Sequence, residues 1–98
     1  MSRRLFVLPA AQDDIAAAAA WYDSERSGLG QAFLERIDGL LQQVTKAPYQ
    51  FPTIQPGVRR GLTRRFPYGV YFMVSESRVD VLAVIHLHRH PESWKRGR

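Results

Sequence analysis

Two helical patterns separated by a glycine-rich break limit most strongly what this chain can fold into. From Pro9 to about Asp23, apolar residues recur at helical spacing within a run of alanines, which have the highest intrinsic helix propensity. Ser27-Gly28-Leu29-Gly30 interrupts this pattern, and a second amphipathic segment then continues until Pro48. Together they predict a helical hairpin. The expected inward positions are Ile15, Ala18, Ala19 and Tyr22 in the first helix and Phe33, Ile37, Leu40, Leu41 and Val44 in the second.

A short strand is expected before the hairpin. Arg4–Leu8 is mainly apolar and is stopped by Pro9, a residue that suits the first turn of a helix. Asp13 and Asp14 follow where carboxylates favour a helix N-terminus.

Three further runs with strand character follow the hairpin, after a proline-rich segment from 49 to 57 that we interpret as an irregular loop packed on the domain. The last run is apolar at almost every position, as in a central strand covered on both faces. The expected class is therefore α+β, of order β-α-α-β-β-β, with the helical hairpin packed on a small, mainly antiparallel four-stranded sheet. The three runs are Val58–Arg64, Tyr68–Val74 and Val79–Leu87.

The composition fits one globular domain spanning residues 1–98. The chain has no cysteine, which excludes disulfides, thiolate nucleophiles and cysteine–zinc sites. Its longest apolar runs, Ile15–Tyr22 and Val81–Ile85, are too short to span a bilayer, so we expect no membrane partner and a cytoplasmic location. The formal charge of +5 favours an anionic partner, either nucleic acid or an acidic protein.

Four arginines cluster on and just after the second strand run. Strand periodicity places Arg59 and Arg65 on the side opposite Val58 and Leu62, which predicts a basic strip beside the open face of the sheet. Such a strip suits phosphates or carboxylates, while the alternative interpretation is an edge strand protected by charge. The four arginines are Arg59, Arg60, Arg64 and Arg65.

Three alternating histidines, His86, His88 and His90, end the last run and would share one side of the strand if it continued that far. Without carboxylate or cysteine support they are a weak zinc signal, and we expect no metal. His86 or His88 is a candidate general acid or base, and the alternative is a partly exposed histidine at a strand end.

Trp94 with Arg96 near the C-terminus is suited either to stacking on a base or to packing across the sheet, and packing is the simpler expectation. Tyr22, Tyr68 and Tyr71 have the helix or strand spacing of core aromatics.

The order and spacing of motifs along nearly the whole chain resemble the RelE/ParE superfamily of toxins from type II toxin–antitoxin systems. The resemblance implies a β-α-α-β-β-β domain without a cofactor, neutralised by an acidic antitoxin that wraps around it. The matching residues are Pro9-Ala10-Ala11, Asp14-Ile15, Trp21-Tyr22, Gly28-Leu29-Gly30, Phe33, Pro48, Phe51-Pro52, Arg59, Phe66-Pro67-Tyr68, Val84, His86, Arg89, Pro91 and Trp94.

The resemblance leaves the cellular target open between two branches. Relatives similar to RelE cut messenger RNA in the ribosome without metal, which needs a base, an acid and cations around the phosphate. In that branch the catalytic residues here are Arg59, Arg65, His86 and His88, with Arg64 as a further cation. Neither lysine, Lys46 or Lys95, lies on a strand run, unlike the RelE pattern.

Relatives similar to ParE instead poison DNA gyrase without being enzymes. The alanine-rich first helix, Phe66-Pro67-Tyr68 and the arginine-rich ending are more similar to this branch, which is the first choice. A non-toxic binding module of the same fold is a third alternative. The target-binding residues expected in the ParE branch are Arg64, Arg89, Trp94 and Arg96.

Overall fold

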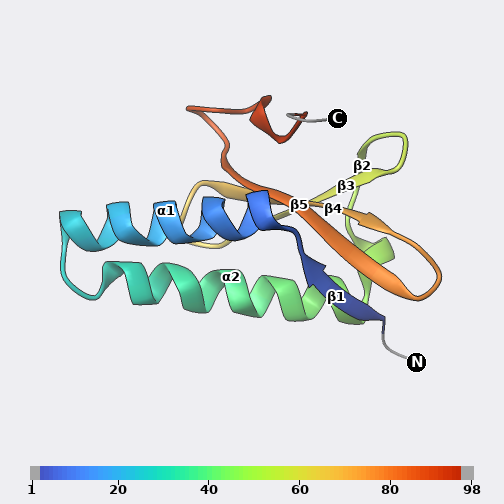
Figure 1. Ribbon diagram of the computed structural model, residues 1–98, viewed down its shortest axis with the longest axis horizontal. Coiled ribbons are helices and arrows are strands. Elements are labelled where there is room, and N and C mark those ends of the chain that lie inside the picture. The colour runs from blue at the N-terminus through green and yellow to red at the C-terminus, as the bar shows by residue number, and fades with distance from the viewer. Residues whose placement is uncertain (1–2, 96–98) are drawn as a thin grey trace.

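The helical hairpin lies on one face of a single β-sheet (Figure 1). The computed structural model describes residues 3–95. The predicted α+β class is confirmed, although the sheet has five strands and not four. The helices are α1 (Pro9–Glu25) and α2 (Leu29–Lys46), the strands are β1 (Arg4–Val7), β2 (Thr53–Gln55), β3 (Val58–Leu62), β4 (Tyr68–Val74) and β5 (Arg78–His86), and two short 3-10 turns are Pro48–Gln50 and Ser93–Lys95.

The strands lie in the order β1-β5-β4-β3-β2. Strand β1 pairs with β5 in parallel, and every other pair is antiparallel, so the mainly antiparallel sheet is confirmed. The two strands furthest apart in sequence are β1 and β5, since the helical hairpin and the β2–β4 meander intervene between them. They are nevertheless neighbours in the sheet. This arrangement makes β5 a central strand, as its continuous apolar run predicts.

The extra strand, β2, corrects the interpretation of segment 49–57 as an irregular loop. The Arg60 amide donates to the Pro52 carbonyl, and Thr53 lies opposite Arg59. Prolines at positions 52 and 56 flank the strand and have no amide hydrogen to donate, which confines it to three residues at the sheet edge. The sequence signal missed here was the short Thr53–Gln55 stretch between two turn-forming residues.

The ends of two strands also differ from the prediction. Strand β3 ends at Leu62 and not at Arg64, because the Thr63 amide and hydroxyl turn back to the carbonyls of Tyr68 and Phe66. Strand β5 ends at His86, where a turn begins. Strand β4 has the predicted bounds.

The two helices are joined tightly at the glycine-rich break. Gly28 has a φ of 89°, which glycine adopts without a Cβ clash, and Asp23 Oδ1 accepts hydrogen bonds from the amides of Gly28 and Gly30. Gly30 lies directly against α1, where an added Cβ would come within 2.5 Å of the Ala19 carbonyl oxygen. A glycine at this position therefore allows the helices to approach.

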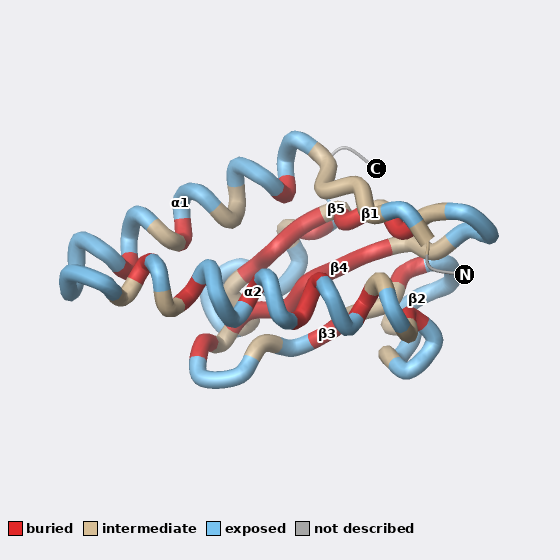
Figure 2. The backbone as a smooth tube through the Cα atoms, turned by 90° about the horizontal axis from the view of Figure 1, so that it is seen from below, coloured by how far each residue is buried: buried red, intermediate tan, exposed pale blue. Residues whose placement is uncertain are grey.

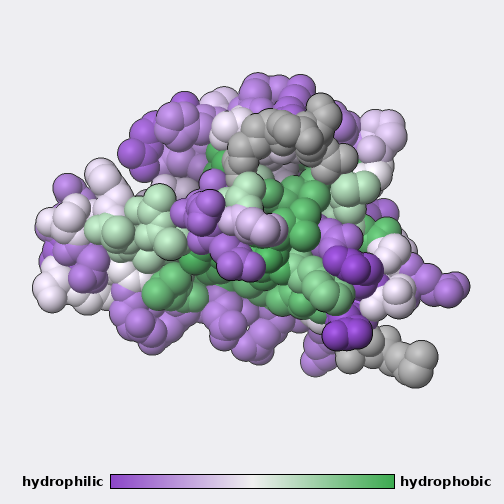
Figure 3. Space-filling view, in the orientation of Figure 1, coloured by the Kyte–Doolittle hydropathy of each residue, from purple (hydrophilic) through white to green (hydrophobic). Residues whose placement is uncertain are grey.

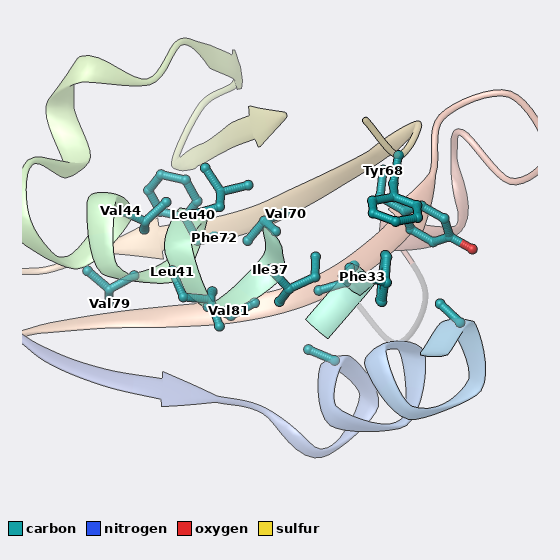
Figure 4. Packing of buried hydrophobic residues seen from close by; sticks show 14 of the residues in the cluster. Phe33, Ile37, Leu40, Leu41, Val44, Tyr68, Val70, Phe72, Val79 and Val81 are labelled. Carbon is teal, nitrogen blue, oxygen red and sulfur yellow. The ribbon is translucent and has the colours of Figure 1, made fainter. Parts of the chain in front are cut away.

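The main core lies between the hairpin and the sheet, with buried residues along β4 and β5 and on the inner side of α2 (Figures 2 and 4). Every inward position predicted for α2 is buried, and in α1 Ala18 and Tyr22 are buried while Ile15 and Ala19 pack against the core. The residues facing the helices from the sheet include Tyr68, Val70, Phe72, Val79, Val81 and Val84.

The opposite face of the sheet carries a second, smaller cluster. The C-terminal segment folds back so that the Trp94 ring, 5% exposed, stacks on Tyr71 with ring centroids 5.3 Å apart. Val58, Ala83 and Ile85 complete the buried part of this cluster. The expectation that Trp94 packs across the sheet is confirmed, and β5 is covered on both faces.

Apolar side chains also gather in the centre of the face that is turned toward the viewer in Figure 3. Leu5 and Val7 of β1 are only partly buried there. Among the helices of residues 3–95, none combines the length and apolar character that crossing a bilayer requires.

We predict that Gly30→Ala lowers the free energy of unfolding by about 1–3 kcal/mol, because the new methyl group overpacks the contact with Ala19. The matched control is Gly39→Ala in the same helix, where a Cβ meets nothing within 4 Å. This control should gain about 0.5–1 kcal/mol from helix propensity alone. Urea denaturation of both variants tests the prediction, and equal stability would contradict the close helix contact.

Candidate functional site

A pocket of about 260 Å³ lies between the middle of α1 and the end of β5. In Figure 1 the last residues of β5 and the segment after it pass beside α1. The small side chains of Ala17 and Ala18 leave room on the helix side. The remaining lining residues are Asp14, Trp21, Tyr68, Val84, Ile85, His86, Arg89 and His90.

An aromatic cluster holds the inner end of the pocket. Phe33 of α2 lies beside Tyr68 (Figure 4). The ring centroid of Phe33 is 5.0 Å from that of Tyr68 and 5.4 Å from that of Phe66. Tyr22 of α1 lies 4.8 Å from Phe66. The turn at Phe66-Pro67 therefore anchors the start of β4 against both helices and fixes the position of Tyr68.

A β-bulge in β5 decides which side chains face the pocket. Tyr71 pairs with Ala83 while Phe72 pairs with Val81, so Leu82 is the extra residue. After the bulge, Val84 joins the cluster that faces the helices, and His86 lies opposite Tyr68 with ring centroids 5.3 Å apart. Without the bulge, strict alternation would place both on the other face.

His86 is held in one tautomer by the turn that follows β5. Its Nδ1 accepts hydrogen bonds from the backbone amides of His88 and Arg89, each 3.1 Å long. Nδ1 therefore carries no proton, and the neutral ring has its proton on Nε2. Burial lowers the pKa of His86, and the charge of Arg89 and the neighbouring His88 and His90 lower it further.

Arg89 forms the outer wall of the pocket together with Trp21. Its guanidinium carbon lies 4.9 Å from the centre of the Trp21 ring, and the Trp21 side chain is 45% exposed. Burial raises the pKa of the Tyr68 hydroxyl, while the charge of Arg89 and a side-chain hydrogen bond to it act in the opposite direction. Arg89 is thus oriented by two aromatic residues from different elements.

Asp14 fastens α1 to β5 at the pocket. Its Oδ2 accepts a hydrogen bond of 2.9 Å from the Val84 amide, beyond the point where β1 ends at Val7. The prediction that Asp13 and Asp14 lie at the helix N-terminus is wrong, because α1 begins at Pro9 and its first turn contains no acidic residue.

The predicted basic strip along the second strand run is wrong. Arg59 lies across the helix-facing side of β3, where it donates to the Phe51 carbonyl over 2.6 Å and packs on Tyr49. Arg60 projects to the other face, over Tyr71. Strand periodicity fails after Leu62 because the chain turns, and Arg65 adopts a φ of 77° in that turn.

The structure brings together only part of the predicted site set. His86 and Arg89 line the pocket, whereas Arg59, Arg64 and Arg65 do not. Arg64 and Arg65 are exposed in the turn after β3, and Arg96 lies outside the described residues. The buried Trp94 ring anchors the C-terminal segment, so its predicted role in target binding requires that segment to move.

The three histidines do not share one side of a strand. Strand β5 ends at His86, and His88 and His90 are exposed in the following turn, so the alternation seen in the sequence is not structural.

Two pocket residues were missed as site residues. Trp21 lies outside the apolar spacing of α1, and a large exposed aromatic residue in an alanine-rich helix was the available signal. Tyr68 was predicted only as a core residue, and it is one, although it also lines the pocket.

Comparison with known proteins is consistent across sequence and structure. Residues 5–91 match the family described as "ParE toxin of type II toxin-antitoxin system, parDE". Toxin ParE2, from two strains of Mycobacterium tuberculosis, is 27% identical over 94 residues, which is 95% of this chain and 90% of the relative. A solved chain of the chromosomal ParDE TA system from P. aeruginosa shares the fold, with a TM-score of 0.72, 20% identity, and coverage of 86% of this chain and 95% of that one.

The lowered pKa of His86, caused first by burial and then by its charged neighbours, predicts that stability depends on pH. The pKa of His86 is lowered in the folded protein, so folding favours the neutral ring. Its contribution to stability is complete above the unfolded-state pKa of about 6.5 and is lost as the pH falls through the lower folded-state value. We predict that the free energy of unfolding, measured by urea denaturation, decreases as the pH is lowered from about 7.5 to about 5.5. Histidines are the main side chains that titrate in this range.

His86→Gln should flatten this pH dependence because it removes the titrating group. His90→Gln is the matched control, since it removes an exposed histidine from the same turn, and it should keep most of the slope. An unchanged slope in His86→Gln would show that His86 does not control the effect.

Proposed function

Since the chain belongs to the ParE toxin family of type II toxin–antitoxin systems, we propose that it stops growth by poisoning DNA gyrase and not by cutting messenger RNA. Membership of this family also implies an antitoxin partner. The resemblance to the ParE branch supplies the target, and the geometry of His86 is the observation that most supports the choice between branches.

RNA cleavage without metal needs a group that can take up and release a proton beside the scissile phosphate. His86 Nδ1 already accepts two backbone amides, so protonating it would break both hydrogen bonds. Its Nε2 holds the proton of the neutral ring and has no lone pair to act as a base. His86 is thereby suited to donating a hydrogen bond and poorly suited to proton transfer.

The cations of the predicted ribonuclease set are also dispersed. Arg59 is engaged with Phe51 and Tyr49 on β3, and Arg65 lies over Phe66 in the turn that follows. Stabilising the charge of a cleaved phosphate requires donors that converge on one point. This dispersal favours a protein that binds its target over one that catalyses a reaction.

We assign target binding to exposed cations near the end of β5 and to the C-terminal segment. Arg64 and Arg89 are exposed on the described surface, and Trp94 and Arg96 belong to the segment that continues past β5. The net charge of +5 would assist encounter with an acidic surface. Both the target and the antitoxin would be met in the cytoplasm.

Inducible expression in bacteria tests the proposed target. Pulse labels for DNA, RNA and protein synthesis should show DNA synthesis falling first, and the purified chain should inhibit supercoiling by gyrase. An immediate fall in protein synthesis with cleaved messages would instead support the ribonuclease alternative, and normal growth would support a non-toxic binding module.

Arg65→Ala and His86→Ala should both remain toxic, within about threefold of the parent chain, because neither supports a transition state in the gyrase mechanism. A ribonuclease would lose about 100-fold or more on removal of a phosphate clamp or an acid. Urea denaturation of both variants serves as the control for folding. Loss of toxicity with the fold intact would overturn the proposed mechanism.

Removing the residues after Pro91 should weaken gyrase inhibition, because it deletes the predicted C-terminal contact. The truncation also removes Trp94 from the second cluster, so Arg96→Gln in the full chain is the matched variant that leaves this packing in place. Unchanged inhibition by both variants would contradict the placement of target binding in this segment.

A further inference from the structure

We infer that the pocket between α1 and the end of β5, lined by Trp21 and Arg89, is the docking site for a single carboxylate side chain of the antitoxin. The inference rests on the antitoxin pairing implied by the family and does not depend on gyrase as the target. The inference starts from the exposed guanidinium of Arg89, which lines a pocket of about 260 Å³ and is oriented by its neighbours.

Arg89 is already oriented before any partner binds. The Trp21 ring lies under its guanidinium, whose carbon is 4.9 Å from the ring centre, and the buried Tyr68 lines the same pocket. Its own backbone amide is fixed by the hydrogen bond to His86 Nδ1. A preorganised arginine loses less rotamer freedom on binding a carboxylate, and its planar fork matches the two carboxylate oxygens.

The Arg89 guanidinium takes part in neither of two ion pairs found in the described part of the chain. Within residues 3–95 these pairs join Arg78 to Asp80 and Lys95 to Glu92. Arg89 instead contacts the Trp21 ring, while the Asp14 carboxylate of the same lining accepts the hydrogen bond of the Val84 amide. An incoming carboxylate would therefore form a new ion pair without displacing one of these.

The remaining lining favours a side chain over a nucleic-acid strand. Ala17, Ala18 and Val84 give the pocket an apolar wall that suits the methylene groups of a glutamate or aspartate. Arg89 is the one arginine of the lining, and His86 is kept neutral by its hydrogen bonds. An RNA backbone carries one charge per nucleotide and is normally followed by several cations, which this lining lacks.

The pocket thus offers one strong charged contact with neutral donors beside it. Arg89 supplies the fork, and the Nε2–H of His86 and the hydroxyl of Tyr68 are further donors of the lining. This combination suits a planar carboxylate with one negative charge at the end of a flexible side chain.

The first experiment uses a small carboxylate probe on the full chain. Titration with N-acetyl-glutamate amide, followed by NMR, should shift the Trp21 indole signal, which Trp21→Phe identifies by its disappearance. N-acetyl-glutamine amide, which has the same shape without the charge, should leave the signal in place. Equal effects of the two probes, or no shift with either, would overturn the inference.

The second experiment uses calorimetry to measure the affinity of the chain for its cognate antitoxin. Arg89→Gln should raise the Kd about tenfold or more, and Arg89→Lys should have a smaller effect because it keeps the charge but loses the fork. Arg36→Gln is the control, since it removes the same charge from an exposed position on α2. An unchanged Kd in Arg89→Gln, or an equal loss in both glutamine variants, would overturn the inference.

A third comparison in the same NMR assay tests whether the pocket is a phosphate-binding site. Inorganic phosphate or a short RNA that shifts the Trp21 signal at lower concentration than the glutamate probe would assign the pocket to nucleic acid and overturn the inference. Because every readout is binding to the isolated chain, these results are independent of gyrase inhibition. A failure of the proposed target would leave them unaffected.

Discussion

The burial of β5 on both faces is the constraint on which the rest of the structure depends. The helical hairpin covers Val79, Val81 and Val84, and the C-terminal segment covers Ala83 and Ile85. Each valine or isoleucine among them contributes about 1.5–3 kcal/mol when fully buried, so neither layer is dispensable in a chain of 98 residues. The polar backbone of a strand buried in this way must also be satisfied. Where β1 ends, the Asp14 carboxylate accepts the hydrogen bond of Val84 and so places α1 beside the pocket.

The many arginines are distributed by aromatic partners and do not form one basic surface. Within residues 3–95, seven of them lie over rings, and four of these seven have partners at separate places on the fold, so local packing sets their positions. Within residues 3–95, the pair of Arg89 and Trp21 near the end of β5 combines an exposed ring with a pocket. The net charge therefore attracts anions generally, while recognition depends on this one place. The pairs are Arg59 with Tyr49, Arg60 with Tyr71, Arg65 with Phe66 and Arg89 with Trp21.

Hydrophobic periodicity was sufficient to predict the helices, the three main strand runs and their core residues, because burial imposes the helical and strand repeats directly on sequence. It could not predict the bulge at Leu82, since one extra residue changes which face a side chain occupies without changing the composition. The same limitation affected the site. His86 and Arg89 were named from the sequence, but their setting against Asp14 and Trp21 arises from contacts across about 70 residues of chain, for which no local pattern exists.

The apolar lining also bears on how an antitoxin could hold a cationic toxin at physiological salt. Attraction between exposed charges is largely screened beyond about 8 Å at an ionic strength of 0.15 M. The charge of +5 would therefore speed encounter more than it would strengthen the bound state. A carboxylate bound to Arg89 in the pocket is partly shielded from solvent by Ala18 and Val84, so its ion pair is screened less. If Arg89 also contacts the target, the same ion pair withdraws a target-binding cation, and neutralisation follows from occupancy of one pocket without coverage of the whole basic surface.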